Sequence, residues 1–280
     1  METENIVILV TGASSGIGQA IAKTLAKDPR NIVYGTSRKA ADYFSDSRVH
    51  MLQMDVTDEQ SVASAVEKLI EKEKQIHVLV NCAGFGISGS VESVPVDIAQ
   101  KQFEVNFFGV VRVIQKVLPF MRAQGRGTII NIGSVAGYIS IPFQSMYSAS
   151  KYALESLSEA LRMELAPFNI HVCLVEPGDT RTNFTKSRLK AGKEEIEALY
   201  EPASTHAVSV MEEDEQNGYP PEEVAFVVEK IIRKKKPPMR TNVGIEYKLI
   251  YILNRILPTG LKLKVLMKKY TGKVAKNLKD

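Results

Sequence analysis

The chain has 280 residues, of which 44% are hydrophobic and 24% are charged, with 18 Gly and 12 Pro. This composition is that of a folded globular protein and excludes collagen-like, disulfide-rich and intrinsically disordered chains. The net charge of +4 is unevenly distributed, because residues 1–232 carry 22 Lys and Arg against 30 Asp and Glu, whereas residues 233–280 carry 14 against 2. An acidic body with a basic C-terminal segment is therefore the first feature that needs an explanation.

The cysteines and histidines indicate neither disulfides nor metal. Cys82 and Cys173 each lie in an apolar run, and we expect both to be reduced, buried thiols in a cytoplasmic protein. The four histidines are scattered, so we expect no metal site. The apolar run that starts at Ile6 leaves no room for a basic leader before it, so we expect no signal peptide. No apolar window is long enough to predict a membrane-spanning helix.

Predicted strands and helices alternate along most of the chain. Apolar and β-branched runs predict strands at Ile6–Val10, Asn31–Gly35, His50–Met54, Val78–Val80, Thr128–Ile132 and His171–Val175. Apolar residues spaced three and four apart, or long apolar runs, predict helices at Gln19–Lys27, Ser61–Lys72, Ile98–Met121, Ser148–Leu165 and Glu222–Arg233. Such alternation predicts an α/β fold of the Rossmann type, a doubly wound parallel sheet of about seven strands with helices on both faces.

Two segments depart from this alternation. Residues 183–220 are polar, and acidic at Glu212–Glu215, and we interpret them as a mobile, helical insertion that contributes to substrate binding. Residues 244–280 form a basic, amphipathic C-terminal extension. We therefore expect a single domain over residues 1–243, followed by this extension.

A glycine-rich turn, Thr11-Gly12-Ala13-Ser14-Ser15-Gly16-Ile17-Gly18, leaves the first predicted strand and opens the first predicted helix. This is the context that a dinucleotide site requires. Gly12 would allow the tight turn, Gly16 would let the backbone approach the pyrophosphate, and Gly18 would let helix and strand pack closely. The N–H groups and positive end of the helix would then attract the phosphates. The alternative is a plain strand–helix turn that binds nothing.

The spacing T-G-x-x-x-G-x-G resembles that of the short-chain dehydrogenase/reductase family, and further segments within about residues 5–240 follow the same pattern. Asp55-Val56 resembles the family's adenine-pocket dipeptide, and Asn81-Cys82-Ala83-Gly84 its N-N-A-G segment with Cys in place of the second Asn. The run Pro177-Gly178-Asp179-Thr180-Arg181-Thr182 resembles its nicotinamide segment. The residues that match its catalytic tetrad in order and spacing are Asn106, Ser134, Tyr147 and Lys151. The resemblance implies hydride transfer between a nicotinamide and a carbonyl or alcohol carbon.

The end of the second predicted strand indicates which cofactor the site would accept. Dinucleotide folds that use NAD place an Asp or Glu there to hold the ribose 2′-OH. Here the sequence is Gly35-Thr36-Ser37-Arg38-Lys39, in which Ser37 and Arg38 can bind a 2′-phosphate instead. The sequence therefore favours NADP(H) over NAD(H), the alternative being a solvated loop in an enzyme that does not discriminate. The candidate cofactor-binding residues are Gly12, Ser14, Ser15, Gly16, Ile17, Gly18, Ser37, Arg38, Asp55, Val56, Asn81, Cys82, Ala83, Gly84, Tyr147, Lys151, Pro177, Gly178, Thr180 and Thr182.

Tyr147 and Lys151 are four residues apart, so a helix places both on one face. We expect the Lys151 ammonium to lower the pKa of Tyr147, which can then donate or accept a proton. Ser134 follows the predicted strand Thr128–Ile132, at the edge of the sheet where ligands bind, and can hydrogen-bond the substrate oxygen. The resemblance implies further that Lys151 binds the nicotinamide ribose, and that the backbone of Asn106 holds a water linking Lys151 to solvent.

The segment Val135–Phe143 beyond Ser134 is apolar and lacks Lys and Arg, which predicts a hydrophobic ketone, alcohol or aldehyde as substrate. The candidate substrate-binding residues are Ser134, Val135, Phe143 and Tyr147. Residues 137–161 and Pro221–Ala225 resemble the 17β-hydroxysteroid and retinol dehydrogenase branch, which implies a steroid or retinoid. The same features fit other bulky lipid ketones.

Two interpretations belong to other classes. A non-catalytic NADP-binding protein could use the same fold as a redox sensor, but an intact catalytic tetrad argues against it. A nucleic-acid binder would explain the basic extension, but its aromatic residues are only Tyr247, Tyr251 and Tyr270, so we expect no nucleic acid as partner.

The helices Ile98–Met121 and Ser148–Leu165 carry more apolar surface than one sheet face needs. The family pairs these helices between subunits, so the resemblance implies a homodimer or homotetramer. In the C-terminal extension, apolar residues alternate with Lys and Arg between Tyr247 and Lys269. The extension is therefore either an amphipathic segment lying on an anionic membrane, or a cap over the substrate pocket with its lysines in water.

Overall fold

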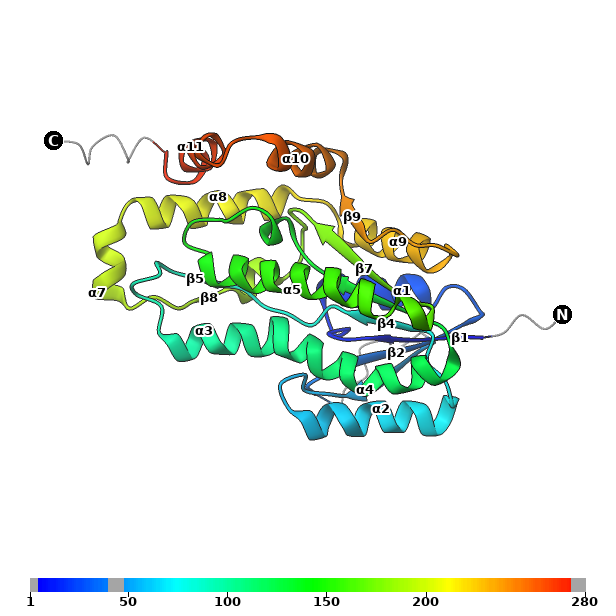
Figure 1. The fold of residues 1–280 in the computed structure, drawn as a ribbon. Coiled ribbons are helices and arrows are strands. Elements are labelled where there is room, and N and C mark those ends of the chain that lie inside the picture. Colours follow the sequence, from blue (N-terminus) through cyan, green and yellow to red (C-terminus); the bar gives the residue numbers. More distant parts are fainter. Residues whose placement is uncertain (1–4, 40–47, 273–280) are drawn as a thin grey trace.

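The computed structural model describes residues 5–39 and 48–272. Seven parallel strands form one sheet in the order β3-β2-β1-β4-β6-β7-β9 (Figure 1). Their bounds are β1 (Ile6–Val10), β2 (Asn31–Ser37), β3 (Val49–Gln53), β4 (Val78–Asn81), β6 (Gly127–Ile132), β7 (Ile170–Pro177) and β9 (Arg240–Val243). The predicted Rossmann-type fold is confirmed, and so is the expected number of strands.

Helices cover both faces of this sheet because its strands are apolar on both sides. In β1, Val7 and Leu9 face one hydrophobic cluster, whereas Ile8 and Val10 face the other. The first cluster includes residues of α2 (Glu59–Glu73), α4 (Gly109–Gln124) and α5 (Ser145–Glu164). The second includes residues of α1 (Gly16–Leu25) and α9 (Pro221–Ile232). Burial of apolar surface on two faces stabilises the three-layer architecture.

The strand order reverses next to β1. The chain runs from β1 outward to β2 and β3, and then returns to β4 on the other side of β1. In doubly wound sheets, ligands bind outside the carboxyl ends of the strands at this reversal. The glycine-rich turn follows β1 at this reversal. Ser134 follows β6, which lies two strands away from β1 in the sheet.

The predicted helix Ile98–Met121 is not a single regular helix. It consists of α3 (Val96–Phe103), a π-helical turn at Glu104–Phe108, and α4. A π turn accommodates one extra residue in a helix and is frequent at functional sites. Asn106 lies in the middle of this turn and is buried.

The predicted insertion at residues 183–220 is helical, as expected. It contains α6 (Phe184–Ser187), α7 (Glu194–Glu197) and α8 (Ala203–Asn217). A short strand, β8 (Leu189–Lys190), pairs with β5 (Ile87–Ser88) in a separate two-stranded sheet.

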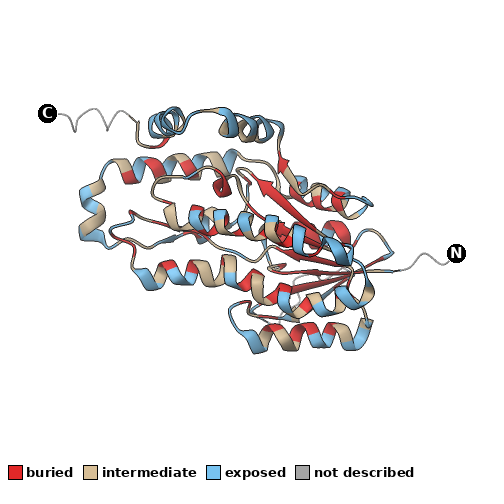
Figure 2. Cartoon of the chain, viewed as in Figure 1, coloured by how far each residue is buried: buried red, intermediate tan, exposed pale blue. Residues whose placement is uncertain are grey.

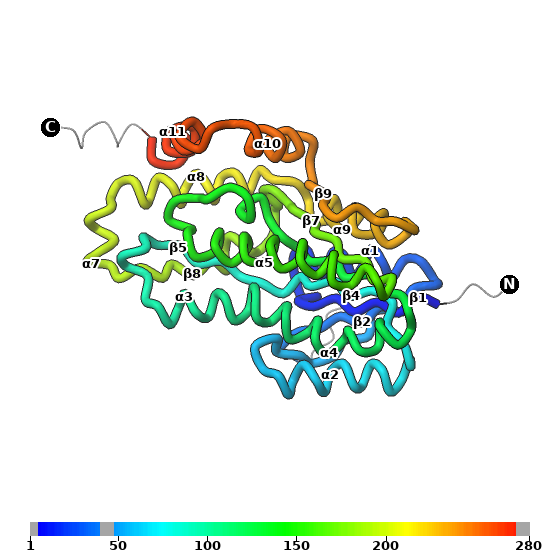
Figure 3. The backbone as a smooth tube through the Cα atoms, viewed as in Figure 1, coloured from blue at the N-terminus to red at the C-terminus, as the bar shows by residue number. Residues whose placement is uncertain are grey.

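The C-terminal extension folds into two helices, α10 (Ile245–Ile256) and α11 (Thr259–Tyr270). They form an outer layer beside α8, at the edge of the molecule that carries the insertion (Figures 1 and 3). Gly244 alone separates β9 from α10, and its φ of 97° favours glycine. In the described residues, no helix is long and apolar enough to cross a membrane.

Candidate active site

A cavity of about 930 Å³ lies at the carboxyl edge of the sheet, between the glycine-rich turn, α5, the insertion and the C-terminal helices. Twenty-one of the residues proposed from sequence line it. They are Gly12, Ser14, Ser15, Gly16, Ile17, Gly18, Ser37, Arg38, Asp55, Val56, Cys82, Ala83, Gly84, Ser134, Val135, Tyr147, Lys151, Pro177, Gly178, Thr180 and Thr182. One cavity thus brings together segments that are up to 170 residues apart in the chain.

Three proposed residues lie outside the lining. Asn81 is buried and donates to the Asn131 side chain at 2.9 Å, so it joins β4 to β6. Asn106 is buried in the π turn. Phe143, expected to bind substrate, packs instead against the ring of Tyr200 at 6.1 Å, and Ile139 and Ile141 of the same segment line the cavity. The Phe143 side chain packs against a hydrophobic cluster that includes Ala207 and Met211 of the insertion.

The glycine-rich turn has the geometry of a phosphate cradle. Gly12 and Gly16 have φ of 68° and 54°, which favour glycine. A Cβ at Gly18 would lie 2.4 Å from the Gly12 carbonyl oxygen, whereas one at Gly16 would meet nothing closer than 3.5 Å. Gly18 is thus required by packing, whereas Gly16 lines the cavity in front of α1, where a Cβ would make ordinary contact with Thr182.

The start of α1 offers its backbone donors to that space. Ser15 caps the helix without a side-chain hydrogen bond, and the first turn holds no acidic residue. Thr11 ties the turn to the segment after β4, because its hydroxyl accepts from the amides of Cys82 and Ala83 at 3.0 and 3.1 Å. The Cys82 substitution therefore leaves this backbone link intact. These residues fit the pyrophosphate and adenosine half of a dinucleotide.

The catalytic candidates converge from three elements. Ser134 is the N-cap of the short helix Val135–Gly137 and accepts from the Ala136 amide at 3.1 Å. Tyr147 and Lys151 lie on α5, with the Lys151 Nζ 5.8 Å from the centroid of the Tyr147 ring. The same Nζ donates to the Ile132 carbonyl at 2.9 Å, which directs the ammonium toward the end of β6.

Burial changes the pKa of both side chains. It raises the pKa of Tyr147 to about 12, although a hydrogen bond with Ser134 acts in the opposite direction. It lowers the pKa of Lys151 to about 8. The prediction that the pKa of Tyr147 lies below its ordinary value is thus wrong for the protein alone, because loss of hydration outweighs the Ser134 hydrogen bond and the charge of Arg188.

Asn106 is linked by hydrogen bonds to α5, the helix that carries Tyr147. Its side chain accepts from the Phe85 amide at 3.1 Å and donates to the Phe85 carbonyl at 3.0 Å. It also donates to Ser150 Oγ at 3.3 Å, and Ser150 in turn donates to the Tyr147 carbonyl at 2.7 Å. The π turn, the segment after β4 and the first turn of α5 are therefore locked together.

Sequence reasoning missed two acidic residues of the lining, Asp179 and Glu215. Burial raises the pKa of both carboxyl groups. Glu215 is paired with Arg188, whose side chain is 1% exposed. Both acids also raise the pKa of Tyr147 through their charge. The sequence did not indicate either residue. Glu215 lies in a polar insertion, and Asp179 lies at a position that the family's nicotinamide segment does not specify.

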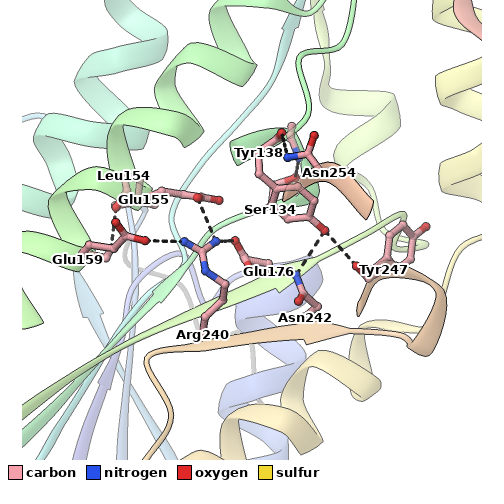
Figure 4. A network of polar contacts seen from close by, with 12 residues as sticks. Ser134, Tyr138, Leu154, Glu155, Glu159, Glu176, Arg240, Asn242, Tyr247 and Asn254 are labelled. Atoms are coloured by element: carbon pink, nitrogen blue, oxygen red, sulfur yellow. Dashed lines mark hydrogen bonds and ion pairs between the residues drawn. The ribbon is translucent and has the colours of Figure 1, made fainter. Parts of the chain in front are cut away.

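The C-terminal helices close one side of the cavity. A Cβ at Gly178 would lie 2.0 Å from the Tyr247 ring, and the Tyr247 hydroxyl donates to Asp179 at 2.8 Å. Asn254 donates to the Tyr138 carbonyl at 2.9 Å (Figure 4). Lining residues contributed by α10, α11 and their connection are Tyr247, Ile250, Leu253, Asn254, Leu257, Lys262, Val265, Leu266, Lys269 and Tyr270. The extension therefore caps the pocket, which is one of the two alternatives that the sequence left open.

Known proteins place these features in a family. A family model described as short chain dehydrogenase matches residues 6–193. The chain is 44% identical to a 3-ketodihydrosphingosine reductase of Bacteroides thetaiotaomicron, over 85% of this chain and 87% of that protein. It is 37% identical to human 17-beta-hydroxysteroid dehydrogenase type 1, over 84% of this chain and 76% of that protein. A solved short-chain dehydrogenase of Streptomyces avermitilis superposes with a TM-score of 0.80 at 30% identity, covering 100% of both chains.

The chain therefore belongs to the short-chain dehydrogenase/reductase family and is an oxidoreductase. Family membership also supports a nicotinamide cofactor. Within the described residues, no cluster of His, Cys, Asp and Glu could hold a metal ion.

Proposed function

We propose that the protein is an NADP(H)-dependent oxidoreductase that interconverts a hydrophobic lipid ketone and its secondary alcohol. The observation that supports this most directly is the single cavity shared by the glycine-rich turn, Tyr147 and an apolar wall. A bound nicotinamide would supply or accept the hydride. The protein would contribute the position of the carbonyl and the proton that it needs.

Three side chains would carry the proton chemistry. The Ser134 hydroxyl would hydrogen-bond the substrate oxygen and hold it against the Tyr147 hydroxyl. Tyr147 would give its proton to that oxygen in reduction and take it back in oxidation. The Lys151 ammonium, 5.8 Å from the ring centroid, would stabilise the phenolate as it forms.

The NADP(H) preference rests on the end of β2. Arg38 lies at the cavity and is exposed there, and the segment Gly35–Lys39 carries no acid that would repel a 2′-phosphate. The Ser37 hydroxyl donates to the Lys39 carbonyl at 2.5 Å, so it is part of the same turn. Comparison of the KM values for NADPH and NADH tests this preference. A lower KM for NADH would contradict it.

The substrate that we favour is a long-chain ketone with an amino group beside the carbonyl. The relative named 3-ketodihydrosphingosine reductase supports a long-chain ketone, and the buried carboxyl groups of Asp179 and Glu215 support the amine. An ammonium group bound there would also offset the effect of these two carboxylates on Tyr147, whose pKa they raise. Steroids and retinoids, favoured by the sequence resemblance, offer no cation to these acids. They remain the second candidate because of the relationship to 17-beta-hydroxysteroid dehydrogenase type 1.

An assay of NADPH oxidation separates these candidates. The panel contains 3-ketodihydrosphingosine, the same chain without its amine, estrone and retinal. We expect the highest kcat/KM for the amino ketone, and at least tenfold less for the ketone that lacks the amine. A higher kcat/KM for estrone or retinal would instead favour the second candidate. No turnover of any of the four, with NADPH bound, would favour a non-catalytic NADP-binding protein.

We also propose that the protein is cytoplasmic and acts as a homodimer or homotetramer. Several apolar side chains on the helices that the family pairs between subunits are exposed, among them Val96, Phe108 and Met163. Burial of these side chains against a second copy would remove apolar surface from water. Analytical ultracentrifugation tests this expectation, which a monomer at micromolar concentration would contradict.

A further inference from the structure

The outward surface of the C-terminal helices is unusually apolar. Half of the 18 large hydrophobic side chains that are exposed in the described residues lie in this short segment. They are Ile245, Leu249, Ile252, Leu253, Ile256, Leu261, Leu263, Val265 and Met267. Leu253 and Val265 also line the cavity, and the other seven do not. No residue of α10 is buried, and Figure 2 shows that both helices are mostly exposed. Contiguous apolar surface of this kind marks an interaction site.

The exposed apolar residues follow the helical repeat. In α10, Ile245, Leu249, Ile252 and Ile256 are spaced four, three and four residues apart, so they form one stripe along the helix. They are between 56% and 81% exposed, and none of them lines the cavity. A helix that only capped the pocket would not need this stripe.

The same two helices are apolar on their inner side. Ile250 and Leu257 of the α10 region and Leu266 of α11 line the cavity. The helices therefore present one apolar side to the substrate pocket and another to the surroundings. A layer only one helix thick separates the two.

The charges around the stripe indicate what covers it. Between residues 245 and 270 there are six Lys and Arg and a single acidic residue, Glu246. Lys264 and Lys268 are exposed beside Leu263 and Met267 on α11. The same face of a second copy would carry the same positive charge and repel it. An anionic lipid bilayer offers both the apolar depth and the negative charge.

We propose that α10 and α11 form a membrane-docking lid, which lies on an anionic bilayer and passes lipid substrate from it into the cavity. The helices have 12 residues each, so they lie in the interface rather than across the bilayer. Their inner residues become the wall along which a lipid chain enters. The delivery step rests on the proposed function, whereas the docking step does not.

Vesicle co-sedimentation of the full-length protein tests the docking. The probes are vesicles of phosphatidylcholine alone and of phosphatidylcholine with about 30% phosphatidylserine. We expect binding to the anionic vesicles, weaker binding at high salt, and little binding to neutral vesicles. The triple variant Leu249→Gln/Ile252→Gln/Ile256→Gln should bind anionic vesicles at least about tenfold more weakly. The variant Lys264→Gln/Lys268→Gln should lose part of the salt-sensitive binding.

A matched control removes three apolar side chains elsewhere. Val91, Phe168 and Leu199 are 62%, 41% and 76% exposed, and they lie outside both the C-terminal helices and the helices that we expect to pair between subunits. The variant with Gln at these three positions should bind anionic vesicles as the unmodified protein does. A thermal melt confirms that each variant is folded, because exposed substitutions change stability little.

The outcomes separate docking from delivery. Equal binding of the stripe variant and the unmodified protein, or no binding to anionic vesicles at all, would overturn the docking. Conversion of a dimer to a monomer by the stripe variant would show that a second copy covers the face, and would overturn it as well. If docking holds, the kcat/KM for 3-ketodihydrosphingosine in anionic vesicles should fall at least fivefold in the stripe variant, and an equal kcat/KM would overturn delivery alone. No turnover by any variant would contradict the proposed function and leave docking to the sedimentation result.

Discussion

Burial acts in opposite directions on the two ionisable side chains that α5 places together. It raises the pKa of Tyr147 to about 12 and lowers that of Lys151 to about 8. A tyrosine with this pKa keeps its proton at neutral pH, as an acid for ketone reduction must. Lys151 is then the group whose charge changes in the accessible pH range.

The rate of ketone reduction should therefore fall as pH rises through about 8. Below that pH the Lys151 ammonium is charged and stabilises the phenolate, and above it the charge is lost. We expect kcat/KM to be level below pH 8 and to decrease about tenfold per pH unit well above it. In Lys151→Arg the residual activity should lack this decrease up to pH 10, because arginine stays charged. A decrease at the same pH in the variant would show that another group titrates.

Loss of the tyrosine hydroxyl should abolish turnover without preventing cofactor binding. In Tyr147→Phe the proton donor is gone, and such a group contributes about 10²–10⁴ in rate. We expect kcat to fall by at least a hundredfold and the Kd for NADPH, measured by fluorescence titration, to change less than threefold. The control Tyr200→Phe removes a hydroxyl that bonds Glu92 at 2.7 Å on the surface, and should keep its activity. A Tyr147→Phe enzyme that retains more than a few per cent of kcat would contradict the assignment.

At the scale of elements, the glycine-rich turn combines a packing requirement with a binding one. Gly18→Ala places a Cβ 2.4 Å from the Gly12 carbonyl oxygen, so the turn must shift. Gly16→Ala meets only ordinary contacts at 3.5 Å, and its cost is the positive φ of 54°.

We therefore expect Gly18→Ala to lower both Tm and NADPH affinity. Gly16→Ala should cost only about 1–2 kcal/mol of stability, and should weaken NADPH binding at least tenfold because it fills the phosphate cradle. Thermal melts with and without NADPH distinguish these effects. A larger loss of Tm for Gly16→Ala than for Gly18→Ala would contradict the packing argument.

The elements that could be predicted from the sequence are those with a local signal. Strand runs such as Ile6–Val10 and the Tyr147–Lys151 spacing depend on neighbours within a few residues, and they lie where expected. The π turn at Asn106 has no local signature, because the sequence on both sides of it predicts a regular helix. Asp179, Glu215 and Tyr247 reach the cavity only through tertiary contacts, so no local pattern indicates them.

At the scale of the molecule, Arg240 connects the sheet edge to its surroundings (Figure 4). It pairs with Glu155 at 3.0 Å, with Glu159 at 2.9 Å and with the fully buried Glu176, and its guanidinium stacks on Tyr251. Burial and the neighbouring Glu155 raise the pKa of Glu176, whereas Arg240 opposes this. One residue thus holds β7, β9, α5 and α10 together.

Arg240→Met should destabilise the protein by about 3–5 kcal/mol, because it leaves buried carboxylates without a cation. The raised pKa of Glu176 means that the folded state holds a proton that the unfolded state releases above about pH 4.5. The Tm of the unmodified protein should therefore fall as pH rises from 5 to 8, and the Tm of Arg240→Met should lie below it by a similar amount throughout, because Glu176 stays protonated in both. The control Arg30→Met breaks an exposed pair with Asp28 and should change Tm little. A Tm of the unmodified protein that rises over this range would contradict this account.

A few hydrogen bonds attach the C-terminal helices to the rest of the protein, so the loss of these bonds should open the cavity. Tyr247→Ala/Asn254→Ala removes the bonds to Asp179 and Tyr138, each worth about 1 kcal/mol. We expect the KM for a bulky ketone to rise about tenfold, with less than a twofold change for a small one. Tyr219→Phe, which removes an exposed bond to Glu246 on the same helix, is the matched control. An unchanged KM for the bulky ketone would show that these bonds do not control access.

The contact between the Tyr247 ring and Gly178 has a thermodynamic consequence. Gly178 belongs to the segment that would hold the nicotinamide, so cofactor binding and the docking of α10 share one point of contact. If cofactor binding alters that contact, it changes the membrane affinity of the lid, and reciprocity requires the membrane to change cofactor affinity by the same factor. The bilayer would then be an effector of the enzyme as well as its substrate reservoir, and the cellular supply of reduced cofactor would influence how long the enzyme stays on the membrane.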